Sequence, residues 1–176
     1  MADLVVCVGD SLTVGSCSES GTPWHQRVTN RLASEWRAYA VGGASLNVIS
    51  AATLAGYGSG YTEKVAILWA GTNPISAGSQ TGAQFFTDYD AYRATLQASG
   101  WLVVGCLLQD MPTNDTEAQA FNTLLSGSTD FDAVADLRTP LPDCTDTTKY
   151  YSDQIHLLDV GYALVATAIQ TAMATL

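Results

Sequence analysis

A serine, a histidine and an aspartate occur in this chain at positions where they could act together on a substrate. Ser11 stands in the tetrapeptide Gly9-Asp10-Ser11-Leu12, directly after the first apolar run, and Asp153 precedes His156 by three residues. A serine hydroxyl becomes an effective nucleophile when a histidine removes its proton, and a carboxylate can hold that histidine in the required tautomer. These residue types predict nucleophilic catalysis by Ser11, with His156 as the base and Asp153 as its orienting group.

Short apolar runs along the chain predict the strands that position these residues. Such runs are continuous and rich in β-branched residues, as in strands buried on both faces. They lie at residues 4–8, 38–41, 65–69, 101–108 and 131–135. Helical spacing predicts a helix at residues 84–98 and, less strongly, one at 45–55. It also predicts a last helix that has Asp159 near its start and buries Tyr162, Val165, Ile169 and Met173.

Two further helices are predicted together with their starting signals. Thr22 reads as the N-cap of a helix that begins at Pro23 and buries Trp24, Val28 and Leu32. Asn114 and Glu117 resemble a capping box at the start of a helix that carries Phe121 and Leu125. Strands that alternate with helices predict a parallel sheet covered on both faces. We therefore expect residues 1–176 to form one three-layer α/β/α domain.

The predicted topology gathers the polar motifs at one edge of the sheet. Ser11 follows the first strand, Gly43 the second and Asn73 the third, while Asp153 and His156 follow the fifth by a long loop. Ligands of open α/β sheets bind at the carboxyl ends of the strands. These residues are therefore expected to lie close together.

The motifs, in their order along the chain, resemble those of the SGNH (GDSL-type) hydrolase family. They are Gly9-Asp10-Ser11-Leu12, Gly42-Gly43, Gly71-Thr72-Asn73 and Asp153-Gln154-Ile155-His156. The resemblance implies a flavodoxin-like, five-stranded α/β/α fold and a triad of Ser11, Asp153 and His156. It also implies an oxyanion hole formed by the backbone N–H groups of Ser11 and Gly43 and the side-chain amide of Asn73, without metal or cofactor. Gly42 is the alternative to Gly43, and the chain departs from the family pattern at Pro74, where an aspartate is usual.

Two other classes of site fit the sequence less well. The order Ser, Asp, His also occurs in α/β-hydrolases, but their Gly-x-Ser-x-Gly elbow is absent, since Thr13 stands where the second glycine would be. A phosphate-binding loop is disfavoured because neither Gly-x-Gly-x-x-Gly nor the P-loop pattern occurs. His25, beside Trp24, is interpreted as a partly exposed structural residue. Asp10 is expected to shape the serine turn by bonding to the backbone.

The resemblance implies a serine esterase, and the short loops after the first three predicted strands favour small acyl groups. We expect hydrolysis of short-chain carboxylic esters, with deacetylation of a carbohydrate as the preferred hypothesis. A lysophospholipase or thioesterase of the same family is an alternative. A non-catalytic carbohydrate-binding domain of the same fold is another. The sequence leaves the natural acyl group and alcohol open.

The composition of the chain disfavours some classes of binding partner. The net charge is −10 and hydrophobic residues make up 47% of the chain. An acidic surface disfavours nucleic acid and anionic membranes, and no apolar stretch reaches the roughly 18 residues of a membrane span. The start has no basic region, so we expect no signal peptide, while compartment and oligomeric state stay open. The four cysteines lack zinc-site spacing, and a Cys17–Cys144 disulfide is one possibility left open.

Overall fold

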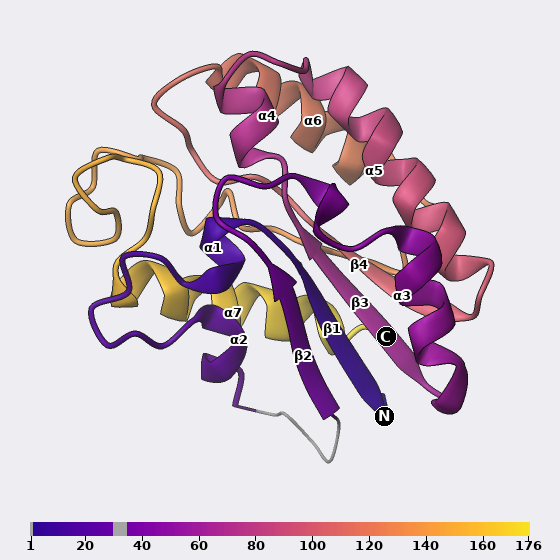
Figure 1. Cartoon of the computed structure of the whole chain (residues 1–176). Helices are drawn as coiled ribbons and strands as arrows, with labels where there is room; N and C mark the ends of the chain where they lie inside the picture. Colours follow the sequence, from indigo (N-terminus) through magenta and orange to yellow (C-terminus); the bar gives the residue numbers. More distant parts are fainter. Residues whose placement is uncertain (1, 30–34) are drawn as a thin grey trace.

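Five parallel strands form one sheet in the order β2-β1-β3-β4-β5 (Figure 1). The structure is a computed structural model and describes residues 2–29 and 35–176. The strands are β1 (Leu4–Gly9), β2 (Glu35–Ala40), β3 (Lys64–Trp69), β4 (Trp101–Cys106) and β5 (Ala133–Ala135). The five predicted strands are confirmed, with ends that differ by a few residues. The sheet is thus the parallel one expected from the sequence.

The centre of the sheet is its most apolar part. Every residue of β1 and β3 is buried, whereas β2 lies at an edge and is half exposed. In the register, Leu4 of β1 lies between Glu35 of β2 and Lys64 of β3. Strands covered on both faces need apolar side chains in both directions, which explains their continuous apolar runs.

Helices cover both faces of this sheet and confirm the three-layer α/β/α fold (Figure 1). On one face, α5 (Gly82–Gln97) packs between α3 (Ala51–Tyr57) and α6 (Asp115–Gly127). On the other face, α7 (Asp159–Met173) crosses the sheet beside α2 (Trp24–Arg27). The short helices α1 (Ser11–Val14) and α4 (Thr72–Ser76) directly follow β1 and β3. Within the described ranges, none of the helices has both the length and the apolar character needed to cross a membrane.

Aromatic side chains of α5 and α6 form much of the core on one face. The predicted stripe of α5 is buried, and it consists of Phe85, Tyr89, Tyr92 and Leu96. The ring of Tyr89 packs edge-on against Phe121 of α6, with centroids 5.2 Å apart. The Tyr89 hydroxyl also donates to the carbonyl of Leu68 at 2.5 Å and accepts the N–H of Cys106 at 3.0 Å. This buried hydroxyl therefore ties α5 to β3 and β4 near the ends that carry the site.

The helix predicted from Thr22 is shorter than its apolar spacing suggested. It covers only α2, its N-cap is Pro23, and no side-chain hydrogen bond caps it. The backbone becomes extended at Val28, which ends the helix. Trp24 and Val28 are buried as predicted, while Leu32 lies outside the described residues.

The capping box predicted at Asn114 and Glu117 is wrong. Asn114 precedes α6 in the left-handed conformation, with φ of 55°, and its amide donates to the carbonyls of Ile75 and Ser76. The Glu117 carboxylate accepts the N–H of Gly82 at 2.8 Å. Both side chains therefore join α6 to α4 and α5 instead of closing the start of their own helix.

Two other helix starts also differ from expectation. A capping box is present at Thr81 and Gln84, so α5 begins two residues before the predicted start. The weak helix predicted over 45–55 is two elements, the 3-10 turn η1 (Leu46–Val48) and α3. They separate because Ile49 is extended and the Ser50 hydroxyl caps α3. A second 3-10 turn, η2 (Gly58–Gly60), follows α3.

Candidate active site

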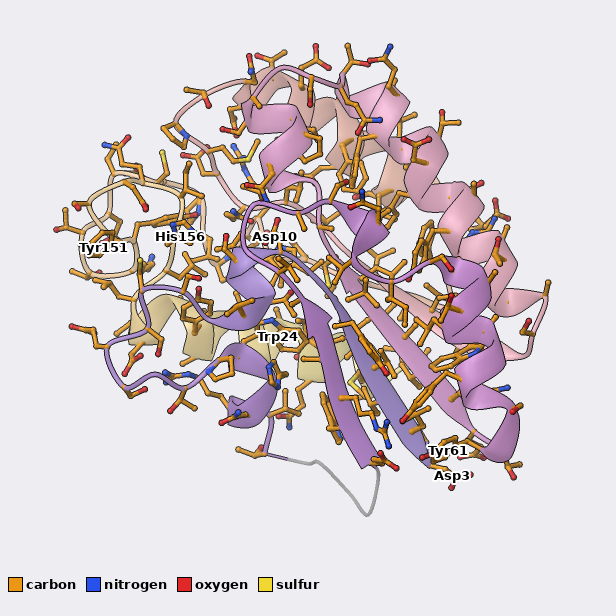
Figure 2. The ribbon with its side chains drawn as sticks, viewed as in Figure 1. Asp3, Asp10, Trp24, Tyr61, Tyr151 and His156 are labelled. Carbon is orange, nitrogen blue, oxygen red and sulfur yellow. The ribbon has the colours of Figure 1, made fainter. Side chains whose placement is uncertain are left out.

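The carboxyl ends of β1 and β3 lie side by side and lead into the two short helices that carry Ser11 and Asn73. The chain runs from β1 outward to β2 and then returns to β3 on the other side, so this edge is a topological switch point, where open sheets bind ligands. Gly9 permits the close packing, because a Cβ there would lie 2.3 Å from the Trp69 carbonyl oxygen. Figure 2 shows Asp10 and His156 at this edge, and Asp3 and Tyr61 at the opposite one.

The structure brings Ser11, His156 and Asp153 into one hydrogen-bonded chain. Ser11 Oγ lies 2.8 Å from His156 Nε2, and His156 Nδ1 lies 2.7 Å from Asp153 Oδ2. Since a carboxylate accepts, Nδ1 carries the ring proton and donates to Asp153. Nε2 is then left with a lone pair that accepts the Ser11 hydroxyl. This tautomer is the one that removes a proton from serine.

Asp153 also builds the turn that presents the histidine. Its other oxygen, Oδ1, accepts the backbone N–H groups of Ile155 at 3.0 Å and His156 at 2.9 Å. Partial burial by itself raises the pKa of the Asp153 carboxyl, but hydrogen bonds from the His156 side chain and these two N–H groups outweigh it and lower the pKa. The carboxylate therefore stays ionised where it faces the imidazole.

The triad is open to solvent. The side chain of His156 is 23% exposed and that of Asp153 is 39% exposed. Ser11 is half-buried, and the glycine pair at 42–43 is exposed. A substrate can therefore reach Ser11 from solvent without entering a deep tunnel.

The amide of Asn73 makes contacts that the motif alone did not predict. Its Nδ2 donates to Asp10 Oδ2 at 3.2 Å and to the Ala44 carbonyl at 2.9 Å. A primary amide has two N–H donors, so both have a protein acceptor here. Donation to a substrate oxygen would require one of these bonds to be shared or released, and the longer bond to Asp10 is the weaker one.

Asp10 lies beneath the serine and is only 1% exposed. As predicted, it shapes the serine turn, because Oδ1 accepts the N–H of Leu12 at 2.9 Å and caps α1. Burial raises the pKa of the Asp10 carboxyl to about 6, although the Leu12 hydrogen bond and the charge of His156 act in the opposite direction. Asp10 therefore connects the serine turn to the Asn73 amide through one buried carboxyl group.

The comparisons agree with this arrangement of motifs. The model of the GDSL-like lipase/acylhydrolase family matches residues 7–164. The chain belongs to this family. Its motifs are those of the SGNH hydrolases, as the sequence resemblance indicated. No curated protein matches the chain.

Solved structures with the same fold include several hydrolases of this family. A lipolytic protein of the G-D-S-L family from Veillonella parvula has a TM-score of 0.80 at 17% identity, covering 98% of this chain and 99% of its own. An acetyl esterase mutant with an acetate ion has a TM-score of 0.76 at 16% identity, covering 97% and 96%. A family 3 carbohydrate esterase from Clostridium thermocellum has a TM-score of 0.74 at 15% identity, covering 97% and 94%. At these identities the comparisons show a shared fold.

The departure from the family pattern at Pro74 fits the local structure. Asn73 and Pro74 lie in the first turn of α4, after Gly71. An N–H in this turn has no partner within the helix, so proline costs little there. Pro74 is buried, and its carbonyl accepts the N–H groups of Ser79 and Gln80. The segment after Asn73 is thus fixed by a helical turn and its contacts instead of by a carboxylate.

Gly43 and Gly42, the two alternatives for the oxyanion role, stand next to each other in one turn. They form a tight turn that the N–H of Ala44 closes on the Val41 carbonyl at 3.1 Å. Gly43 has φ of 77°, which glycine adopts without strain. A Cβ on Gly42 would lie 3.8 Å from the Cβ of Ser11, so the turn borders the serine directly. The choice of Gly43 over Gly42 stays a prediction.

The expectations for His25 and for the cysteines can also be compared with the structure. His25 is half-buried and its ring centroid lies 5.7 Å from that of Trp24, as its structural interpretation predicted. All four cysteines are free, so Cys17 and Cys144 form no disulfide. Cys17 instead lies beside Asp153 and His156. Sequence reasoning missed this neighbour, since Cys17 and Asp153 are 136 positions apart and no spacing in the chain indicates their contact.

The buried Asp10 carboxyl predicts how stability depends on pH. Its pKa is about 6 when folded, against an ordinary 3.8, so between these pH values the folded state keeps a proton that the unfolded state has lost. The free energy of unfolding should fall as pH rises from about 4 to about 6, by up to about 3 kcal/mol from this group. Asp10→Asn removes that titration. Urea unfolding should show a smaller loss for the variant, and parallel curves for the two proteins would contradict the prediction.

Proposed function

We propose that this protein is a serine esterase that hydrolyses short-chain carboxylic esters. The observation that carries the proposal is the chain of two short hydrogen bonds, from Ser11 Oγ to His156 Nε2 and from His156 Nδ1 to Asp153 Oδ2. It lies at the edge of the sheet where ligands bind. Its members perform the three roles that acyl transfer by serine requires.

In the first half of the reaction, Ser11 Oγ attacks the ester carbonyl carbon while His156 Nε2 takes the hydroxyl proton. The imidazolium that forms is stabilised by the ionised Asp153 carboxylate at 2.7 Å. When the tetrahedral intermediate collapses, Nε2 gives its proton to the leaving alkoxide. The products of this half are an alcohol and an acyl group bonded to Ser11.

The negative charge that develops on the carbonyl oxygen needs donors that are already in place. We assign this role to the N–H groups of Ser11 and Gly43 and to the amide of Asn73. Ser11 is the first residue of α1, so its N–H has no partner within that helix. Asn73 takes part when it shares or releases its 3.2 Å bond to Asp10.

In the second half, water replaces the alcohol. His156 Nε2 removes a proton from water, the resulting nucleophile attacks the acyl carbon, and the proton returns to Ser11 Oγ as the carboxylic acid leaves. The openness of the site supports this step, because solvent reaches His156 directly. The proposed mechanism uses only residues of this chain.

The open site also supports a small acyl group on a large alcohol. A shallow site buries little of a long acyl chain, so each added methylene gains less than the roughly 0.8 kcal/mol of full burial. A saccharide alcohol, by contrast, can extend over an exposed surface. An acetyl esterase and carbohydrate esterases among the solved structures of this fold support the same choice. We therefore propose acetyl esters of carbohydrates as the preferred substrates.

A series of p-nitrophenyl esters tests this substrate class. We expect kcat/KM to be highest for acetyl or propionyl esters and to fall as the acyl chain lengthens to octanoyl and beyond. Release of acetate from a chemically acetylated oligosaccharide should accompany activity on the acetyl ester. The same series distinguishes the alternatives named above.

Two different results would contradict different parts of the proposed function. A steady rise in kcat/KM from acetyl to long acyl chains would favour the lysophospholipase or thioesterase and reject the short-chain proposal. Equal rates for wild type and Ser11→Ala would reject serine catalysis altogether and favour a non-catalytic binding domain. The intact hydrogen-bonded triad is the observation that argues against that last outcome.

A further inference from the structure

The thiol of Cys17 lies next to two members of the triad, and all three side chains are of types that can hold a metal ion. The thiol sulfur of Cys17, a carboxylate oxygen of Asp153 and a ring nitrogen of His156 all lie within 4.8 Å of one another. Cys17 and Asp153 are exposed, so a dissolved ion can approach them. We propose that these three side chains bind a thiophilic divalent cation such as Zn²⁺, and that the bound ion inhibits the enzyme.

The neighbours of Cys17 hold it against this part of the molecule. The carbonyl of Ser16 accepts the hydroxyl of Tyr162 at 2.7 Å, and the hydroxyl of Ser18 donates to Asp159 Oδ1 at 2.6 Å. Tyr162 and Asp159 belong to the start of α7, which begins three residues after His156. Cys17 is thus anchored on both sides to the helix that follows the triad histidine.

The three donors form a set that suits zinc. Thiolate, imidazole and carboxylate are its usual protein ligands, at about 2.3, 2.0–2.1 and 2.0–2.2 Å. In a tetrahedral site these lengths put ligand atoms about 3.3–3.7 Å apart. The three side chains therefore need only small movements, and the exposed Cys17 side chain can rotate toward the other two. A water molecule completes the fourth position, and the net charge of −10 attracts cations to the surface.

Cys17 is available as a ligand. It is the exposed one of the four cysteines, while Cys7, Cys106 and Cys144 are buried. The backbone N–H of Cys144 donates to Asp110 Oδ2 at 2.8 Å. When the ion binds, the Cys17 thiol loses its proton to solvent and the sulfur lone pair forms the bond to the metal. No change of oxidation state is involved.

Metal binding and catalysis exclude each other because they need the same atoms. Of the two ring nitrogens of His156, Nε2 contacts Ser11 and Nδ1 contacts Asp153. An ion on Nε2 removes the base for Ser11, and an ion on Nδ1 displaces the proton that Asp153 accepts. Either geometry breaks the triad. The inhibition rests on the proposed esterase function, whereas the binding of the ion does not.

The test combines a thiol measurement with the esterase assay. A chromogenic aromatic disulfide should modify one thiol per native wild-type chain, and ZnCl₂ should protect that thiol. Zn²⁺ should inhibit hydrolysis of p-nitrophenyl acetate over the same concentration range, with recovery on adding EDTA. Cys17→Ser should keep the metal-free activity, lose the reactive thiol and need at least about tenfold more Zn²⁺ for half inhibition. His25→Gln, which changes the other histidine, should behave like wild type throughout.

Each contrary result has its own meaning. Failure of Zn²⁺ to protect the thiol, or equal inhibition of Cys17→Ser and wild type, would overturn the metal site. A wild-type protein without esterase activity in EDTA would instead overturn the proposed function. In that case protection of the Cys17 thiol by Zn²⁺ would still decide whether the ion binds.

Discussion

Ser11→Ala is expected to lower kcat for p-nitrophenyl acetate by about 10⁴- to 10⁶-fold. The substitution removes the oxygen that attacks the ester, and the methyl group of alanine cannot act as a nucleophile. Any residual rate above that of water would come from substrate binding and the oxyanion donors. Steady-state kinetics of purified wild type and variant measure the effect.

We expect the Ser11→Ala variant to fold like wild type, so that a difference in kcat reports on the chemistry alone. The hydroxyl of Ser11 pairs with His156, whereas the turn around it is held by Asp10 and by the backbone. Circular dichroism and urea unfolding should therefore be close to wild type. A folded Ser11→Ala protein with more than about a tenth of wild-type kcat would contradict the assignment of Ser11 as nucleophile.

His156→Gln is expected to have an effect of similar size, about 10⁴- to 10⁶-fold in kcat. Glutamine fills much of the same space but cannot take a proton from Ser11. Asp153→Asn should lower kcat about 10⁴-fold. A carboxylate only accepts hydrogen bonds and so keeps the ring proton on Nδ1, whereas an amide can also donate and so favours the wrong tautomer of His156. The kcat values of the three variants are measured with the same ester and at the same pH.

The double variant Ser11→Ala/His156→Gln sharpens this second prediction. Residues that act as a unit are strongly non-additive, so the double variant should be about as slow as either single variant. His25→Gln is the matched control and should keep wild-type activity, since His25 packs beside Trp24. Multiplication of the two single effects in the double variant would mean that Ser11 and His156 act independently.

The strands and the long helices could be predicted because each carries an unambiguous pattern. The central strands are buried on both faces and appear as unbroken apolar runs. The stripe of Phe85, Tyr89 and Leu96 on α5 repeats over several turns. Patterns that extend over this many residues predict the element correctly whatever tertiary contacts it makes.

Short helices and their ends could not be predicted in the same way. The four and five residues of α1 and α4 are too few to show a helical period. At Asn114 and Glu117 the local pattern gave a capping box, but contacts with α4 and α5 take both side chains. Tertiary partners that are distant in sequence outweighed the local signal there.

In the site, too, the sheet topology was predictable from the sequence, whereas individual side-chain contacts were not. The proximity of Ser11, Asp153 and His156 followed from the carboxyl edge of a parallel sheet and from the family motifs. The bond between Asp10 and Asn73, and the position of Cys17 beside Asp153, depend on side-chain packing that no spacing in the chain records. The main residues were therefore predictable, while the contacts that Asp10 and Cys17 make with them required the structure.

The most direct test of the central claim is labelling with an organophosphorus fluoride, followed by mass spectrometry of the peptides. Such reagents react with a serine that a histidine has activated. We expect one adduct per chain, on the peptide that contains Ser11 and on Ser11 itself, with no adduct in His156→Gln. An unlabelled wild-type protein, or an adduct on any other residue, would contradict this claim.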